Sequence, residues 1–333
     1  MRRFLLFSLS GLGACALALV SISLGPVHFG PHALYAALRA GPFSQDVAAQ
    51  IIWTLRFPRL ILAIAAGIVM ARAGMALQVV TRNGLADPYL FGLSSGASAG
   101  AMAMIVFFGD QFGAMTAFTG AICGGGLATI FLMTLLFSQL NHRSFAAPGR
   151  LILGGVAISF LFTTCADLLV YAGDRNTAQS ILFWTMGSFS AADWQTLPFA
   201  LTAIMILTLF LKIKALPLEA LKAGDDVARS LGVCTSRLRV QTILLCALSC
   251  GAVVAITGPI PFIGLIVPHL VRGLGRMTIT EMTPIVGVLG AGLAVGSDVM
   301  GRIVLPDQEI PVGVVISAMG SLFLGWMVAR GRI

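Results

Sequence analysis

The chain has 333 residues, of which 58% are hydrophobic and only 10% are charged. A soluble domain carries about 25% charged residues, so this composition excludes an ordinary water-soluble fold and predicts a multi-pass membrane protein. The formal charge of +8 does not indicate nucleic acid, because no basic patch with interleaved aromatic residues is present and membrane proteins gather basic residues in cytoplasmic loops.

Ten apolar segments are candidate membrane spans, since about 20 apolar residues cross a bilayer. We expect them at residues 4–24, 58–80, 90–108, 113–137, 151–172, 196–211, 238–257, 261–274, 284–304 and 310–328. The eighth is short, and Gly258-Pro-Ile-Pro261 breaks the chain at its start. The sequence therefore predicts an all-α fold with one transmembrane domain over residues 1–333.

The N-terminus has two interpretations. Arg2 and Arg3 before an apolar run are typical of a signal peptide, and Leu12-Gly-Ala-Cys15 is typical of a lipoprotein cleavage site. The alternative is a first membrane helix, which we favour because residues 4–24 are long enough to span a bilayer.

The distribution of basic residues tests the number of spans. With a cytoplasmic N-terminus and ten spans, 15 Lys and Arg residues lie inside, five lie outside and Arg72 lies within a span. Deleting the eighth span would move four arginines outside and only Arg302 inside. Ten spans with both termini cytoplasmic therefore fit the positive-inside rule better.

A short polar turn separates the second and third spans. It consists of Arg82, Asn83, Gly84, Leu85, Ala86, Asp87 and Pro88. Exposed polar backbone is costly in lipid, so this turn must reach water or line a protected cavity.

Arg72 is a charge inside the second span, and such charges tend to face wet cavities. We expect Arg72, and with it Gln78, to line a path and Arg72 to attract an anionic substrate. The alternative is an arginine at a helix interface that bonds carbonyl groups, or one that snorkels toward water.

The longest inner loop covers residues 212–239. Leu218, Leu221, Val227 and Leu231 are spaced for short amphipathic helices with charges between them. Gly224 suits a turn, and Gly232 suits a C-terminal stop. Such helices can lie in a groove of a soluble partner, or they can form a solvated connector.

Several motifs together resemble the FecCD family, the permease subunits of bacterial ABC importers for ferric siderophores, haem and cobalamin. The resemblance spans nearly the whole chain in one order. It rests on Arg56-x-x-Arg59, Ala73-Gly74 with Gln78, Leu85-Ala-Asp-Pro88, Leu90-x-Gly92, Leu151-x-Leu-Gly-Gly-Val156, Phe183-Trp-x-x-Gly187, Gly258-Pro-Ile with Val267-Pro-His269, Asp298 with Gly301-Arg302, and Glu309-Ile-Pro-Val-Gly313.

The resemblance implies a type II ABC importer permease in the bacterial inner membrane. A second permease copy or homologue, two ATPase subunits and a periplasmic substrate-binding protein are the expected partners. The chain has no Gly-Lys dipeptide and hence no P-loop, so the partner ATPase would use the ATP and Mg. We expect no catalytic residue, metal site or cofactor in this chain. A ferric siderophore is the favoured substrate, with haem or cobalamin as alternatives.

The resemblance also assigns roles to particular residues. Arg56, Arg59 and Arg302 would receive carboxylates of the binding protein, although Asp298 lies four residues before Arg302 and could pair with it. The turn at 82–88 would form an inner gate, and Gly84 departs from the proline usual there. Coupling to the ATPase would use residues of the inner loop, namely Gly224, Ala228, Arg229, Leu231 and Gly232.

Two other functions are weighed against this one. Gly92-Leu-Ser94-Ser-Gly96 matches GxSxG and His269 could act as a base, which would suit an intramembrane serine protease. A secondary transporter is the second alternative, but such proteins often carry several intramembrane acids, and here only Asp167 and Asp298 lie within spans. The six cysteines form no CxxC pair and predict neither zinc nor disulfides.

Overall fold

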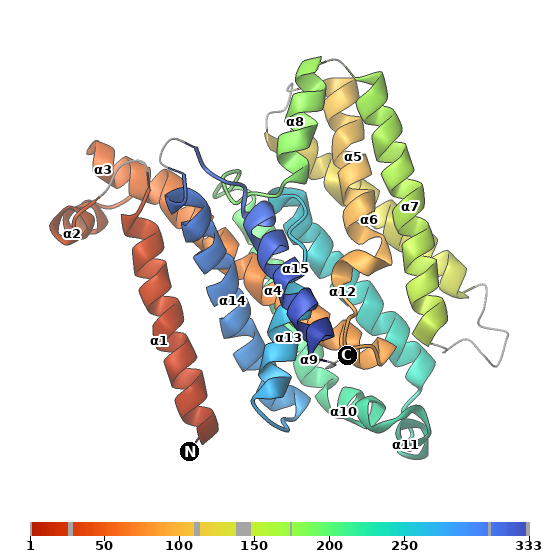
Figure 1. The fold of residues 1–333 in the computed structure, drawn as a ribbon. Helices are drawn as coiled ribbons and strands as arrows, with labels where there is room; N and C mark the ends of the chain where they lie inside the picture. Colours follow the sequence, from red (N-terminus) through yellow and green to blue (C-terminus); the bar gives the residue numbers. More distant parts are fainter. Residues whose placement is uncertain are drawn as a thin grey trace.

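The computed structural model describes residues 2–25, 29–109, 114–137, 148–173, 175–305 and 308–330. Within these ranges the chain forms helices and no strand (Figure 1). The helices are α1 (Arg2–Ser23), α2 (Pro31–Ala40), α3 (Val47–Gln50), the π-helical η1 (Ile51–Arg56), α4 (Phe57–Thr81), the 3-10 turn η2 (Pro88–Phe91), α5 (Leu93–Phe108), α6 (Ala114–Phe137), α7 (Pro148–Ala172), α8 (Arg175–Thr185), α9 (Leu197–Ile213), α10 (Ala215–Ala223), α11 (Asp225–Ser230), α12 (Thr235–Thr257), α13 (Ile263–Gly273), α14 (Ile279–Ile303) and α15 (Val312–Ala329).

Each of the ten predicted spans coincides with a helix, namely α1, α4, α5, α6, α7, α9, α12, α13, α14 and α15. Among the described residues, six helical segments are long and apolar enough to cross a membrane by themselves, and α9 with α10, bent by 62°, would make a seventh. The described part of α1, α5 and α13 are shorter apolar helices. The all-helical membrane fold is therefore confirmed, while the count of ten spans stays a prediction.

The second span is longer than the sequence indicated. The helix runs without interruption from Val47 to Thr81, 35 residues, through the π-helical segment η1. The predicted span began at residue 58 and so left out Arg56 and the helix before it. In the structure Arg56 and Arg59 belong to the helix itself, so their directions are fixed by its geometry.

Helix α4 lies at the centre of the bundle, and glycines let its neighbours approach closely. A Cβ on Gly67 would overlap the backbone of Gly290 in α14, and one on Gly74 would overlap the carbonyl of Gly264 in α13. Helices α5 and α6 meet in the same way through four glycines, Gly96, Gly100, Gly120 and Gly124. Small residues replace side-chain contacts by direct backbone packing, as expected for helices in lipid.

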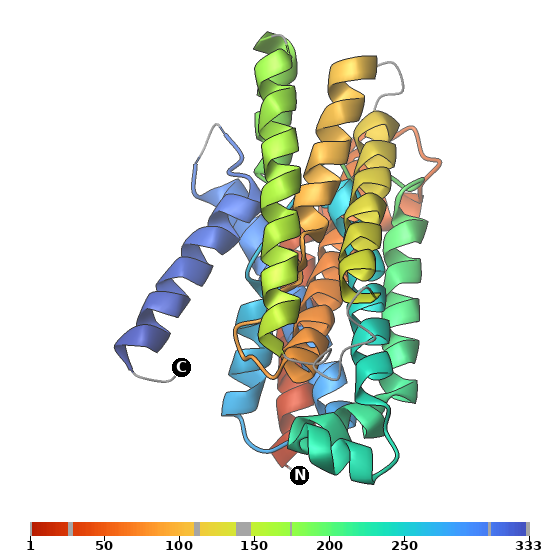
Figure 2. The ribbon, with the colours of Figure 1, turned by 90° about the vertical axis from the view of Figure 1, so that its right-hand side faces the viewer.

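The bundle has two distinct ends. The end with α10 and α11 also carries the start of α1, and it lies at the bottom of Figures 1 and 2. At the other end, α1 finishes, η1 leads into α4, and α14 finishes with Arg302. We call them the loop-helix end and the arginine end.

Two spans leave much of their apolar surface uncovered. Only 17% of the apolar window in α7 and 28% of that in α15 is buried, against 78% in the segment that contains α4. Figure 2 shows α7 in lime and α15 in blue, with α15 standing apart from the bundle. These faces are available to lipid or to another protein chain.

Candidate functional site

Two acidic residues and two arginines form one ion-pair cluster at the arginine end. Asp298 Oδ1 accepts from Arg59 Nε at 3.0 Å and Nη2 at 2.9 Å, and Asp298 Oδ2 lies 2.7 Å from Arg302 Nη2. Glu309 Oε2 lies 2.8 Å from Arg59 Nη1. Asp298 therefore links α4 to the last turn of α14 through its two arginine contacts. Glu309 links the segment before α15 to α4 through Arg59.

Arg302 of this cluster and the neighbouring Arg56 also bind the end of α1. Arg302 Nη1 donates to the carbonyl oxygens of Ser21 and Leu24, each at 3.0 Å, and its Nη2 donates to the Ser21 hydroxyl at 2.6 Å. Arg56 donates to the carbonyl of Ile22 and lies over the Phe29 ring at 4.7 Å from its centroid. The C-terminal carbonyls of a helix favour cations, which explains why two arginines meet the end of α1.

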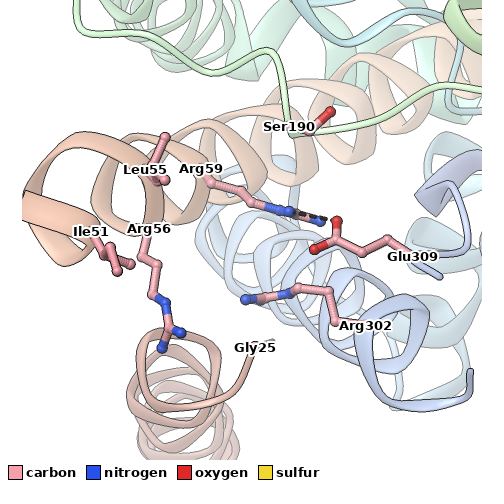
Figure 3. Close-up of a pocket in the computed structure, with 8 residues that line it drawn as sticks. All are labelled: Gly25, Ile51, Leu55, Arg56, Arg59, Ser190, Arg302 and Glu309. Carbon is pink, nitrogen blue, oxygen red and sulfur yellow. Dashed lines mark hydrogen bonds and ion pairs between the residues drawn. The ribbon is translucent and has the colours of Figure 1, made fainter. Parts of the chain in front are cut away.

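The three predicted docking residues, Arg56, Arg59 and Arg302, line one cavity, but two of them are almost fully buried. All three lie at one end, as predicted, and they line one cavity of about 380 Å³ together with Glu309 and Ser190 (Figure 3). However, Arg56 is only 8% exposed, and the Arg302 side chain is only 4% exposed. The possible Asp298–Arg302 pair is confirmed, so both residues hold the bundle together whatever else they do. The docking role stays a prediction.

Arg72 does not face open space. Its Nε donates to the carbonyl of Thr283 in α14 at 3.1 Å, and its Nη1 donates to the Thr208 hydroxyl in α9 at 2.5 Å. A Cβ on Gly287 would come within 2.7 Å of Nη2, so a glycine makes room for the side chain. These contacts match the interface arginine of the alternative interpretation, and the path-lining role of Arg72 stays a prediction.

Gln78 is likewise buried between helices, with 3% of its surface exposed. Its Nε2 donates to the carbonyl of Gly264 at 3.1 Å, and its Oε1 accepts from Arg272 Nη2 at 2.6 Å. Within one copy of the chain Gln78 thus joins α4 to both ends of α13, and its predicted place on a path stays a prediction.

The polar turn is a re-entrant segment and not a surface loop. Arg82 ends α4 in the left-handed conformation with φ 52°, and it is exposed together with Gly84, whereas Ala86, Asp87 and Pro88 are buried. A Cβ on Gly264 would lie 3.1 Å from Asp87 Oδ2 and 3.0 Å from the carbonyl of Met70. Met70 lies 11 residues before the end of α4, which is about 16 Å along the helix axis at 1.5 Å per residue. Because Asp87 lies near the same point of Gly264 as Met70 does, the chain after α4 turns back into the bundle.

Hydrogen bonds fix the deep part of this turn. Asp87 Oδ1 accepts from the Tyr89 amide at 3.0 Å, and the Tyr89 hydroxyl accepts from the Ile260 amide at 2.6 Å. The second contact joins the turn to the break between α12 and α13. The predicted inner gate thus divides into a part near the surface, residues 82–85, of which Arg82 and Gly84 are exposed, and a buried part, residues 86–88. The role of either part as a gate stays a prediction.

The inner loop forms the two predicted short helices, α10 and α11. Gly224 separates them with φ 137°, and Gly232 follows α11 with φ 78°, a conformation that suits glycine. Ala228 is fully buried, while Val227 is 45% and Leu231 is 67% exposed. Helix α11 therefore anchors one face to the bundle and presents apolar side chains on another.

Arg239 links α11 to the end of α4. Its side chain is 1% exposed, its Nε donates to the carbonyl of Val80 at 2.8 Å, and its Nη2 donates to Asp225 Oδ1 at 2.7 Å. Asp225 is the first residue of α11, and Val80 lies one residue before the end of α4. One buried guanidinium thus connects the inner loop to the helix that leads into the polar turn.

Sequence reasoning did not single out Arg239, Arg272 or Glu309. The two arginines look like ordinary positive-inside charges, and nothing in the local sequence marks their distant partners. Glu309 stands in a motif of the resemblance, but no role followed from it. Among the described residues, no group of three His, Cys, Asp or Glu side chains could hold a metal ion.

Comparison with known proteins decides the family. The model of the FecCD transport family matches residues 13–330. The chain belongs to the FecCD transport family. It is 31% identical to the hemin transport system permease protein HmuU of Yersinia pestis over 323 residues, 96% of either chain. It is 33% identical to the vitamin B12 import system permease protein BtuC of Vibrio cholerae over 301 residues, 90% of this chain and 89% of that one.

A solved structure agrees with this membership. An ABC transporter described as of the metal-chelate type, in an inward-facing conformation, matches with a TM-score of 0.82 and 29% identity, covering 98% of this chain and 99% of that one. The FecCD protein is therefore an ABC importer permease subunit and not an enzyme. The serine-protease interpretation of Ser94 and His269 is wrong, and so is the secondary transporter.

Proposed function

We propose that this FecCD permease carries a metal chelate from a periplasmic binding protein into the cytoplasm, driven by ATP hydrolysis in a separate ATPase. The observation that carries the proposal is the family match over residues 13–330. The bundle also has three arginines near one end and the helices α10 and α11 at the other. A ferric siderophore is the leading substrate. Haem or cobalamin is the alternative, and relatives of this chain are named for those two.

The arginine end would face the periplasm, in the orientation that places both termini and most basic residues in the cytoplasm. Three arginines gather there around two carboxylates, so this cluster has a net positive charge. Positive charge in the cluster supports docking of an acidic partner residue, because complementary charges steer association and fix its register. Arg56, Arg59 and Arg302 are the proposed docking residues.

The loop-helix end would bind the ATPase through α11. Its exposed apolar residues Val227 and Leu231 suit a groove in a soluble partner. Movement of α11 would reach α4 through Arg239, because this side chain bonds both Asp225 and Val80. Rigid displacement of packed helices is an established way to open or close a path, and residues 82–88 would be the part that responds.

A second permease copy, or a homologue, would complete the path. The weakly buried faces of α7 and α15 support this proposal, since an oligomer would cover apolar surface that one copy leaves open. Both copies would lie in the bacterial inner membrane, each above one ATPase subunit.

A charge on the exposed face of α11 should separate the ATPase from the permease. We expect Leu231→Asp to weaken ATPase binding at least tenfold, because an apolar contact worth about 1.5–3 kcal/mol would be replaced by a desolvated charge. Folding should hardly change, since Leu231 is 67% exposed.

Binding of the purified ATPase to permease in nanodiscs measures this effect, with melting temperatures recorded in parallel. Thr280→Asp is the control, because it adds the same charge to an exposed residue of the same end. Equal binding by wild type and Leu231→Asp would remove α11 from the proposed interface.

A further inference from the structure

The two carboxylates that contact Arg59 differ sharply in their surroundings. The Asp298 side chain is 2% exposed and contacts both Arg59 and Arg302, so it is a fixed part of the bundle. The Glu309 side chain is 40% exposed and pairs only with Arg59 among the ion pairs of the described residues. Exposed ion pairs contribute little stability, so Glu309 is held weakly where Asp298 is held firmly.

The backbone at Glu309 is fixed although its side chain is not. The amide of Ile310 donates to the carbonyl of Gly301 at 2.9 Å, and Pro311 follows as the N-cap residue of α15. The carboxylate can therefore leave Arg59 by rotation of the side chain, without any movement of the helices.

Glu309 lies at the boundary between two cavities. Arg59, Ser190 and Glu309 line both the cavity of about 380 Å³ and a second one of about 330 Å³. Figure 3 shows Arg59 extending toward Glu309, while the Arg302 side chain points away from the Glu309 carboxylate and Arg56 turns toward Gly25. With Glu309 rotated away, Arg59 would keep Asp298 as an ion-pair partner and would turn its Nη1 to the opening without a carboxylate.

We propose that Glu309 is an internal substitute for an acidic partner residue: it occupies Arg59 in the free permease, and a carboxylate of the periplasmic binding protein displaces it on docking. This inference rests on the proposed function and adds a regulatory step to the same site. Charge complementarity favours a protein carboxylate as the occupant, because the 2.8 Å contact of Glu309 with Arg59 already displays that geometry. Exchange of one carboxylate for another leaves the number of ion pairs unchanged.

The test uses full-length permease in nanodiscs of neutral phosphatidylcholine and a fluorescent hexaglutamate peptide as the carboxylate probe. Glu309→Gln should bind the probe about two- to fivefold more tightly than wild type, the range expected for one exposed ion pair, and the gain should shrink at high salt. Asp193→Asn is the matched control: Asp193 is exposed in the segment between α8 and α9 and belongs to no ion pair among the described residues, so little change is expected.

Two results would overturn the inference. Unchanged or weaker binding by Glu309→Gln would mean that Glu309 does not compete for Arg59. Loss of the gain in nanodiscs that contain phosphatidylglycerol, at equal salt, would identify a lipid headgroup as the occupant. Docking of the binding protein itself is measured separately. If wild-type permease fails to bind it while Glu309→Gln still favours the peptide, the proposed function fails, and only the occupation of Arg59 by Glu309 and its exchange for an external carboxylate stand.

Discussion

Gly124→Leu is expected to separate α5 from α6 and to leave little folded FecCD permease. A Cβ at residue 124 would overlap the carbonyl oxygen of Gly96 and lie 2.7 Å from the Cα of Gly100. Both are backbone atoms, which cannot move aside as a side chain can. Overpacking in a well-packed interior costs about 1–3 kcal/mol, and a leucine against backbone should reach or exceed the upper value.

Gly126→Leu is the matched control on the same helix. No atom lies within 4 Å of a Cβ at Gly126, and either change replaces a weak helix former by a strong one. Thermal unfolding in detergent, followed by size-exclusion chromatography, measures the difference. Equal stability of the two variants would show that α5 and α6 do not pack through these glycines.

Arg239→Gln is expected to destabilise the permease and to uncouple ATP hydrolysis from uptake. The variant leaves the carbonyl of Val80 and the carboxylate of Asp225 without their buried guanidinium. Loss of one partner of a buried ion pair costs about 3–5 kcal/mol, and we expect about 2–4 kcal/mol here because the Asp225 side chain is 20% exposed. The assembled importer should still hydrolyse ATP, since the exposed face of α11 is unchanged.

The readout that distinguishes coupling from stability is the number of ATP molecules hydrolysed per molecule of substrate imported. This ratio should rise in Arg239→Gln at a temperature where the variant is folded, and Arg239→Lys should restore part of it. Arg237→Gln is the control, because Arg237 is exposed on the same helix two residues away. An unchanged ratio in folded Arg239→Gln would exclude the connection through Val80.

Local sequence patterns predicted the apolar helices well, because long apolar runs need no knowledge of their neighbours. The exceptions have physical causes. The predicted span left out the first turns of the 35-residue helix, before residue 58. Nothing in the local sequence indicated a partner for Arg59 either, since the carboxylate that neutralises it, Asp298, lies 239 residues away. The pair Asp298–Arg302 was found because it spans one helical turn.

The candidate site was predictable only where partners are close in sequence. Arg72 stood out as a charge within a span, but its partners Thr208 and Thr283 come from two other helices. The polar turn was predicted to reach water or to line a protected cavity, because exposed backbone is costly in lipid. Its burial depends on the close approach of Asp87 and Pro88 to Gly264, which no spacing within the turn reveals.

The most direct test of the account is uptake by proteoliposomes that contain the permease and its ATPase, with the binding protein on the outside and ATP inside. Radiolabelled ferric siderophore, haem and cobalamin are offered separately. The account predicts that one of them accumulates only when ATP and the binding protein are both present. Accumulation driven by an ion gradient without ATP would contradict it.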